Sequence, residues 1–294
     1  MIAPITYRTL AERTLSLAKT FRFINCQRIG ISYFTRPIYA LSFGCGRKTV
    51  VMTGAHHGSE HLTAALLLDF AEELALAVEA GDRRFALDLR SLLENRRLIL
   101  VPIANPDGVS LATEGITPDV PSPERLLRLN RGNPDFSHWQ ANARGVDLNH
   151  NYDYRFAAYK QIERENRITE GPTRYAGEYP ESESETRAVL NLLRKHFDSP
   201  LASLAFHSQG EVIYYHDMPS TRHAAAFLAR TTGYAPKAAE GLAAYGGLTD
   251  YLASLGIPAF TLEIGKGQNP LPDTDSPLLY ATLRETLFRS LAFF

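Results

Sequence analysis

The chain has 294 residues, of which 45% are hydrophobic and 21% are charged, close to the average composition of soluble globular proteins. Its 31 basic and 32 acidic residues give a net charge of −1, so it lacks the excess of positive charge typical of proteins that bind nucleic acid. The two cysteines, Cys26 and Cys45, are too few for a disulfide framework or a cysteine-based zinc site, and we interpret both as free thiols.

In the first segment of the chain, residues 1–20, Arg, Glu and Lys are scattered among apolar residues. This segment therefore lacks the continuous apolar core of a signal peptide. No other stretch approaches the ~18 consecutive apolar residues of a membrane helix. We therefore expect a cytoplasmic protein that does not bind membranes; the sequence does not define its oligomeric state.

Helical and strand patterns alternate along the chain. In chain order, we expect a helix at 7–20, strands at 30–34, 37–43 and 49–54, a helix at 60–80, a strand at 97–103, a helix at 181–196, strands at 201–207 and 258–264, and a helix at 277–293. Several of the strands are continuously apolar, which is typical of strands buried on both faces. The alternation predicts an α/β fold in a single domain over residues 1–294, with a mixed, largely parallel twisted sheet sandwiched between helices.

One long segment, residues 105–177, interrupts this alternation and is rich in Pro, Gly, Asn and Arg. Connections of this length on α/β domains usually carry function, so we expect a functional loop. The sequence does not determine whether its part at 111–143 covers a cleft.

The first candidate metal ligands follow the strand at 49–54. His57 and Glu60 are separated by two residues at the turn into the next helix, and Gly54 and Gly58 permit a sharp turn there. This spacing lets an imidazole and a carboxylate converge on one cation at about 2.0–2.2 Å each. In catalytic zinc sites a water completes three protein ligands, and two His with one Glu is a known set.

The best third ligand is His207, at the end of the apolar strand at 201–207, because open α/β sheets gather functional groups where strands end. His56 and His61 could also be ligands, but only His57 has the required spacing to Glu60. Such a ligand set accepts several divalent ions, and the order of affinities alone would favour copper. Geometry and metal supply therefore decide which ion is used.

Five short strings resemble those of the carboxypeptidase A-like zinc metallopeptidases and occur in that family's order. They are GAHHGSE at 54–60, NPDG at 105–108, GVDLN at 145–149, LAFHSQG at 204–210 and FTLEIG at 260–265. The resemblance spans nearly the whole chain and is weakest at 111–143. It implies a phosphorylase/hydrolase-like zinc peptidase architecture and a hydrolase with one Zn2+ per chain.

The resemblance also implies roles for individual residues. His57, Glu60 and His207 match the zinc ligands. Glu263 matches the catalytic glutamate, and Asp147 matches an aspartate that accepts the N–H of the first ligand histidine and so orients it. In the implied mechanism zinc lowers the pKa of its bound water to about 7, and Glu263 takes a proton from that water and returns it to the leaving amine.

Three positions depart from the digestive members of the family. Asn149 is followed by His150, where those enzymes have an arginine that binds the terminal carboxylate of the substrate, and imidazole is a weaker carboxylate ligand than guanidinium. Gln140 stands in place of an arginine that stabilises the oxyanion, so Arg144 or zinc itself would take that role. Ser59 replaces an arginine that contacts the peptide upstream of the cut. These differences imply a different substrate.

Two further strings, HSQGEVIYY at 207–215 and EIGKGQNPLP at 263–272, resemble the γ-D-glutamyl-meso-diaminopimelate peptidases, which cut bacterial cell-wall (murein) peptides. That resemblance implies a small peptide substrate with several carboxylates and a free ammonium. Tyr245 is similar in position to the family's mobile tyrosine, and Asp250 resembles the residue at the floor of the specificity pocket. The candidate substrate-binding residues are Arg144, Asn149, His150, Glu211, Tyr245, Asp250 and Lys266.

Three alternatives stay open. An ordinary metallocarboxypeptidase would release C-terminal residues and would cleave N-blocked dipeptides. A deacylase would act on small N-acyl amino acids. A protein of another class would bind zinc or a peptide without catalysis, and Glu263 would then be dispensable.

Overall fold

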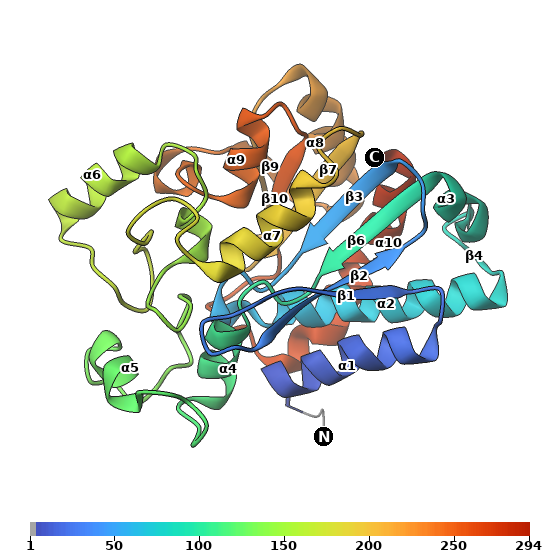
Figure 1. The fold of residues 1–294 in the computed structure, drawn as a ribbon. Coiled ribbons are helices and arrows are strands. Elements are labelled where there is room, and N and C mark those ends of the chain that lie inside the picture. Colours follow the sequence, from blue (N-terminus) through green and yellow to red (C-terminus); the bar gives the residue numbers. More distant parts are fainter. Residues whose placement is uncertain (1–3) are drawn as a thin grey trace.

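An eight-stranded sheet forms the centre of the structure, a computed structural model that describes residues 4–294 (Figure 1). The strands lie in the order β1-β2-β6-β3-β7-β10-β8-β9, and β6, β3, β7 and β10 are parallel neighbours. The predicted mixed, largely parallel sheet is confirmed. The bounds are β1 (Asn25–Ile31), β2 (Pro37–Phe43), β3 (Lys48–Thr53), β6 (Arg96–Val101), β7 (Leu201–His207), β8 (Val212–Tyr215), β9 (Ala235–Ala238) and β10 (Ala259–Glu263).

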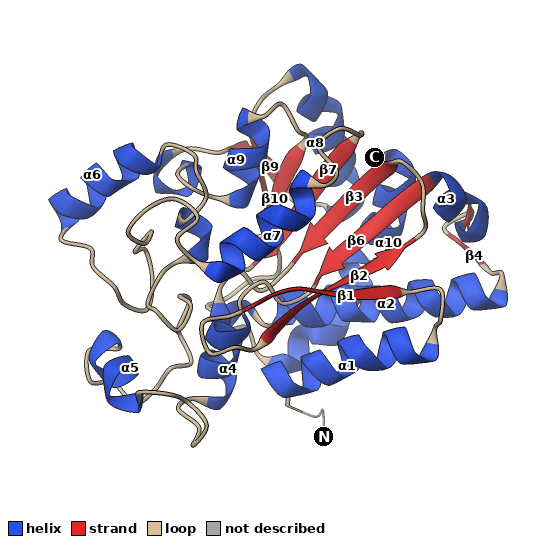
Figure 2. Ribbon diagram, in the orientation of Figure 1, coloured by secondary structure: helices blue, strands red, loops and turns tan. Residues whose placement is uncertain are grey.

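Helices cover both faces of this sheet (Figures 1 and 2). They are α1 (Tyr7–Thr20), α2 (Leu62–Ala80), α3 (Leu89–Asn95), α4 (Pro106–Glu114), α5 (Pro123–Leu129), α6 (Phe156–Asn166), α7 (Ser184–Arg194), α8 (Pro219–Thr232), α9 (Leu248–Ser254) and α10 (Ser276–Phe293). Short elements complete the fold: η1 (Gly58–Glu60), η2 (Leu148–His150), η3 (Gly241–Ala244), η4 (Asp273–Asp275) and a small hairpin of β4 (Arg83–Arg84) and β5 (Leu87–Asp88). Among the described residues, no helix combines the length and the apolar character required to cross a membrane.

Two layers of the hydrophobic core lie against the sheet, one on each face, and two smaller clusters lie around Trp139 and Tyr159. The first layer joins the sheet to α1, α2, α8 and α10, and the second joins it to α7 and α9. Met52 of β3 belongs to the first layer and its neighbour Val51 to the second, because successive side chains of a strand point to opposite faces. This double burial explains why the central strands are continuously apolar in sequence. The predicted sandwich is confirmed.

Some predicted elements were wrong. The strand expected at 30–34 is β1, which ends at Ile31; residues 32–36 form a turn in which the Ser32 N–H donates to the Arg36 carbonyl. Because β1 is a largely exposed edge strand, its first residues are polar and lack the apolar pattern from which the other strands were predicted. The segment at 105–177 is not a continuous loop, since it contains α4, α5, η2 and α6. The strands β8 and β9 and the helices α8 and α9 were also missed.

A buried carboxyl group lies in the first turn of α7. Glu185 accepts a hydrogen bond from the Tyr33 N–H at 3.3 Å, and it is 1% exposed. Burial, together with repulsion from Asp107, raises the pKa of Glu185 from 4.5 to about 7. Between these pH values the folded chain holds a proton that the unfolded chain releases, so the free energy of unfolding falls as the pH rises.

We expect Glu185→Gln to reduce this pH dependence. The amide keeps an oxygen for the Tyr33 N–H but has no charge to bury, so the variant should be more stable than the wild type at pH 8, by up to about 3 kcal/mol. Urea unfolding at pH 5 and pH 8 measures the difference. Equal slopes in the two proteins would contradict the assignment. Glu285→Gln, at an exposed position of α10, is the control.

Candidate metal centre

Three neighbouring parallel strands bring the candidate catalytic residues to one edge of the sheet. His57 and Glu60 follow the carboxyl end of β3, while His207 and Glu263 are the last residues of β7 and β10. In the pairing of β7 with β10, His207 and Glu263 stand opposite each other. Residues that are far apart in the sequence therefore meet because parallel strands end together.

The turn after β3 depends on close packing at Gly58. A Cβ atom there would lie 2.2 Å from the carbonyl oxygen of Gly108, in α4, so only glycine fits. Glycine is therefore needed at this turn because of the limited space. The carboxamide of Asn105 holds the same region, because it donates to the His56 and Gln140 carbonyls at 3.0 and 3.2 Å.

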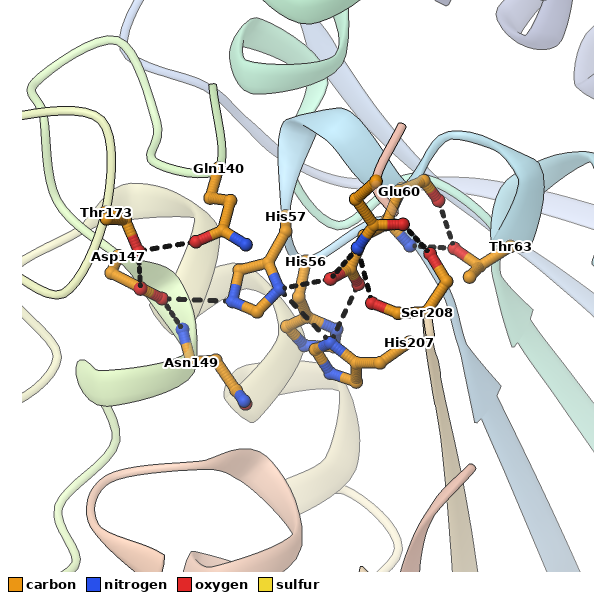
Figure 3. Close-up of polar contacts among 12 residues, drawn as sticks. His56, His57, Glu60, Thr63, Gln140, Asp147, Asn149, Thr173, His207 and Ser208 are labelled. Carbon is orange, nitrogen blue, oxygen red and sulfur yellow. Dashed lines mark hydrogen bonds and ion pairs between the residues drawn. The ribbon is translucent and has the colours of Figure 1, made fainter. Parts of the chain in front are cut away.

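Four electron-pair donors converge at this edge of the sheet (Figure 3). His57 Nδ1 lies 2.8 Å from Glu60 Oε1 and 3.3 Å from His207 Nδ1, and His207 Nδ1 lies 3.0 Å from Glu60 Oε2. His57 Nε2 donates to Asp147, which leaves the lone pair of Nδ1 facing the carboxylate. Such groups repel one another unless a proton or a metal ion lies between them.

The donor set and its spacing fit zinc. One atom from each of His57, Glu60 and His207 lies within 4.8 Å of the others. A tetrahedral ion with bonds of ~2.1 Å separates its ligand atoms by roughly 3.4 Å, close to the distances found here. Glu60 and His207 are buried, whereas His57 is 13% exposed and leaves one side of the group accessible.

The electrostatics of the group favour positive charge. Burial alone would raise the pKa of Glu60, but His57 and His207 outweigh it and lower the pKa to about 2. Burial would likewise lower the pKa of His57, but Glu60 and Asp147 raise it well above its ordinary value. The carboxylates therefore stabilise a cation at the point where the three side chains meet.

Asp147 supports His57 from the side opposite Glu60. Its Oδ1 accepts from His57 Nε2 at 3.2 Å, and its Oδ2 accepts from the Arg174 N–H at 2.9 Å. The pKa of Asp147 lies far below its ordinary value, because His57 and the hydrogen bonds outweigh the effect of burial. This arrangement fits the supporting role that the sequence predicted.

Asp147→Asn should weaken zinc binding by about 10- to 100-fold, because a neutral amide polarises and orients the imidazole less well. Competition with a chelator of known affinity measures the change. Unchanged affinity would show that His57 does not need this partner. Asp153→Asn is a suitable control, because residue 153 is exposed and lies in the same segment.

Glu263 lies on β10 next to the three candidate ligands. Burial raises the pKa of its carboxyl to about 7, with Glu60 adding to the increase and the two histidines opposing it. The other two histidines that the sequence left open lie outside the group: His56 Nε2 contacts the Tyr152 hydroxyl at 3.0 Å, and His61 Nε2 contacts Asp273 at 2.7 Å.

Three of the candidate substrate-binding residues, Asn149, His150 and Tyr245, lie on the segments around Asp147. The Asn149 N–H donates to Asp147 Oδ1 at 3.1 Å. His150 donates through Nδ1 to the Tyr245 carbonyl at 2.7 Å and stacks on Tyr159, with ring centroids 4.2 Å apart. The pairing to Tyr245 fixes the orientation of the imidazole.

The charged candidates already have partners within the chain. The Arg144 guanidinium lies 3.5 Å from Glu183 and 3.6 Å from Glu178. Asp250 is buried and accepts from His216 Nε2 at 2.6 Å.

Glu211 and Lys266 form an ion pair with each other at 2.7 Å. Substrate contact by either residue would therefore compete with this pair.

Sequence reasoning missed three polar residues beside the ligands. Asn269 donates to Glu60 Oε1 at 3.3 Å and exchanges hydrogen bonds with Ser208. The Thr173 hydroxyl donates to the Gln140 side-chain oxygen at 2.5 Å and to Asp147 Oδ2 at 3.4 Å (Figure 3). Asn269 could have been noticed inside the string at 263–272, whereas nothing in the sequence around Thr173 points to it.

Comparison with known proteins places this geometry in a family. The model of Peptidase_M14, described as zinc carboxypeptidase, matches residues 16–278. The chain belongs to the zinc carboxypeptidase family. It is therefore a zinc metallopeptidase and a hydrolase, and zinc is its cofactor, as predicted.

Two bacterial members of the family are similar over most of their length. Gamma-D-glutamyl-L-diamino acid endopeptidase 1 of Lysinibacillus sphaericus is 30% identical over 93% of this chain and 69% of its own. The uncharacterized protein YqgT of Bacillus subtilis (strain 168) is 32% identical over 93% of this chain and 73% of its own.

Solved structures confirm the carboxypeptidase fold. Bovine thrombin-activatable fibrinolysis inhibitor aligns with a TM-score of 0.73 and 19% identity, over 99% of this chain and 97% of its own. The murein-tripeptide amidase MpaA from Escherichia coli O157 aligns with a TM-score of 0.56 and 19% identity, over 91% of each chain. At these identities the likeness concerns the fold alone.

Proposed function

We propose that this zinc carboxypeptidase family member hydrolyses the amide between the γ-carboxyl group of D-Glu and the amine of diaminopimelate in murein peptides. The observation that carries the proposal is the similarity, over 93% of the chain, to a protein named gamma-D-glutamyl-L-diamino acid endopeptidase 1. His150 supports it, since a stacked imidazole paired with a backbone carbonyl cannot bind a terminal carboxylate as an arginine does.

The residues of the site can divide the work of amide hydrolysis. His57, Glu60 and His207 would hold zinc, which supplies Lewis acidity toward the carbonyl and toward an attacking water. Asp147 keeps His57 oriented. Glu263 takes up the proton of the attacking water and delivers it to the departing amine, so that one carboxyl group serves as base and then as acid.

Gln140 fits the role of an oxyanion donor, in place of Arg144. Its side-chain oxygen accepts from Thr173, which leaves the amide NH2 beside His57 (Figure 3). Its backbone is fixed as well, because its N–H donates to the Pro172 carbonyl and its carbonyl accepts from the Gly58 N–H. A donor held in this way can stabilise the charge that develops on the substrate carbonyl oxygen.

Gln140→Glu should therefore lower kcat by about 10²-fold or more, with little change in zinc content. The substitution keeps the shape of the side chain but replaces the donor by an acceptor. Steady-state kinetics and metal analysis are the measurements. A variant with wild-type kcat would remove Gln140 from the mechanism, while loss of zinc would show that the residue acts through His57.

Several finer predictions remain part of the proposal. Residues 1–294 would act as one catalytic domain, with Arg144, Glu211 and Lys266 contacting charged groups of the substrate. The remaining substrate contacts would be made by Asn149, His150, Tyr245 and Asp250. The cytoplasmic location is a prediction that cell fractionation tests, and the absence of nucleic acid and membrane partners stays an expectation.

The deciding experiment uses the zinc-loaded chain with L-Ala-γ-D-Glu-meso-diaminopimelate and with an N-blocked ordinary dipeptide. We expect release of diaminopimelate, detected by mass spectrometry, and no cleavage of the dipeptide. Cleavage of the dipeptide alone would refute the murein substrate and indicate an ordinary metallocarboxypeptidase. If neither compound is cleaved, both the proposed murein reaction and the ordinary carboxypeptidase reaction are refuted.

A further inference from the structure

A pocket whose arginines the proposed mechanism does not use shares Gln140 and Thr173 with the surroundings of the metal centre. Its volume is about 580 Å³, and it is formed by the ends of α5 and α6 and the loop at 168–174. Figure 2 shows that the chain around α5 and α6 consists mostly of loops. We call this pocket the arginine pocket, because its lining contains four arginines: Arg128, Arg131, Arg167 and Arg174. Glu170 is the one carboxylate in its lining, so the pocket carries a strong positive charge.

The four guanidinium groups are free to bind a ligand. Within residues 4–294 none of these four side chains forms a salt bridge or a hydrogen bond with another residue. All four side chains are exposed to solvent. The arginine pocket therefore gathers cations whose charge the protein itself does not neutralise.

The backbone does not explain the choice of arginine at these positions. Arg131, Arg167 and Arg174 have φ values of 56°, 53° and 69°, in the left-handed region that large side chains rarely adopt. Arg167 directly follows α6 and Arg131 lies two residues after the end of α5, positions where glycine or asparagine is favoured. A positive φ at arginine destabilises the backbone. Such strain is found mainly where the side chain has a function, for example in binding a ligand.

Hydrogen bonds connect the pocket to the metal centre. Gln140 and Thr173 line the pocket and are bonded to each other, and Gln140 lies beside His57 (Figure 3). The backbone N–H of Arg174 donates to Asp147, which orients His57. The pocket and the metal centre thus share Gln140 and Thr173, and a ligand in the pocket would contact the residues that flank His57 and Asp147.

We propose that the arginine pocket binds anionic groups, carboxylate or phosphate, that the substrate carries near the scissile amide. Both groups match the planar fork of guanidinium, which forms paired hydrogen bonds with two oxygens. The inference deepens the proposed function and rests on it, because γ-linked D-Glu carries a free α-carboxylate close to the bond that is cut.

The test uses the zinc-loaded double variant Arg131→Gln/Arg167→Gln. Arg174 is left intact because its backbone holds Asp147. The matched control is Arg28→Gln/Arg47→Gln, which removes the same charge from exposed positions on β1 and before β3, remote from the strand ends that carry the site. Three substrates are compared: the murein tripeptide, its analogue with the D-Glu α-carboxylate amidated, and the tripeptide with an N-terminal 3-phosphonopropionyl group.

We expect the pocket variant to raise KM for the tripeptide by about 10-fold or more with kcat within about twofold, and to abolish the preference for free over amidated D-Glu. This result would identify carboxylate as the ligand. An increase confined to the phosphonopropionyl substrate would support the pocket as a phosphate site. KM values equal to those of the control on all three substrates would overturn the proposal.

A binding measurement separates this inference from the proposed function. Calorimetry with L-Ala-D-Glu, a dicarboxylate, requires no turnover and should give about 10-fold weaker binding to the pocket variant than to the control. If the wild type does not cleave the tripeptide but this difference is found, the proposed function fails and the arginine pocket stands. Equal binding by both variants would refute the pocket whether or not the tripeptide is cleaved.

Discussion

Glu263→Gln is expected to lower the rate constant for amide hydrolysis by about 10²- to 10⁴-fold, the usual contribution of a group that transfers protons in the transition state. The amide keeps the size of the side chain but cannot accept a proton from the attacking water. Because Glu263 stands opposite His207 on a neighbouring strand and is not one of the three ligands, zinc should remain bound.

Mass spectrometry of released diaminopimelate measures this loss, and elemental analysis measures zinc in the same samples. Glu285→Gln, on the exposed face of α10, is the matched control and should behave as the wild type. Full activity of the Glu263 variant would exclude the base role. An inactive variant that has also lost its zinc would indicate that Glu263 contributes to binding the ion.

The second large effect concerns His207→Ala. Removing one of three protein ligands should lower zinc affinity by more than the ~10- to 100-fold that loss of a supporting residue costs, so the purified variant should contain much less than one zinc per chain and should be inactive. Zinc should raise the melting temperature of the wild type, because a ligand that binds only the folded state stabilises it, and should not do so in the variant.

Zinc content and melting curves with and without added zinc measure this difference. His223→Ala is the control, because His223 is exposed on α8 and stacks on Phe293. Stoichiometric zinc in the His207 variant would show that another residue completes the set. In the wild type, removal of zinc by a chelator should abolish activity, and zinc addition should restore it.

The sequence predicted those parts of the site that depend on strand ends. His57, Glu60 and His207 could be brought together because continuously apolar runs indicate buried parallel strands, and such strands end at one edge of a sheet. Of the helices in the two layers, α1, α2, α7 and α10 were predicted from their helical sequence patterns, whereas α8 and α9 were not. These features are local patterns whose spatial consequence is fixed by simple geometry.

Other features could not be predicted because they depend on contacts between distant segments. The α5 helix has only seven residues, and both α5 and α6 lie in a segment rich in Pro, Gly, Asn and Arg that was interpreted as a loop. From the sequence, Gln140 indicated only that the arginine of the digestive enzymes is missing. Its possible role as a donor depends on its orientation, which is set by Thr173, 33 residues away. The pairing of Glu211 with Lys266 joins two loops whose proximity no local pattern indicates.

The 150-residue separation between His57 and His207 has a consequence for how the protein is made. Closing so long a loop costs chain entropy before any contact repays it, so the pairing of β3 with β7 is a late event in folding. During synthesis, the ribosome releases the first two ligands long before the third. We therefore expect the complete set of three ligands to form only after the central strands have assembled.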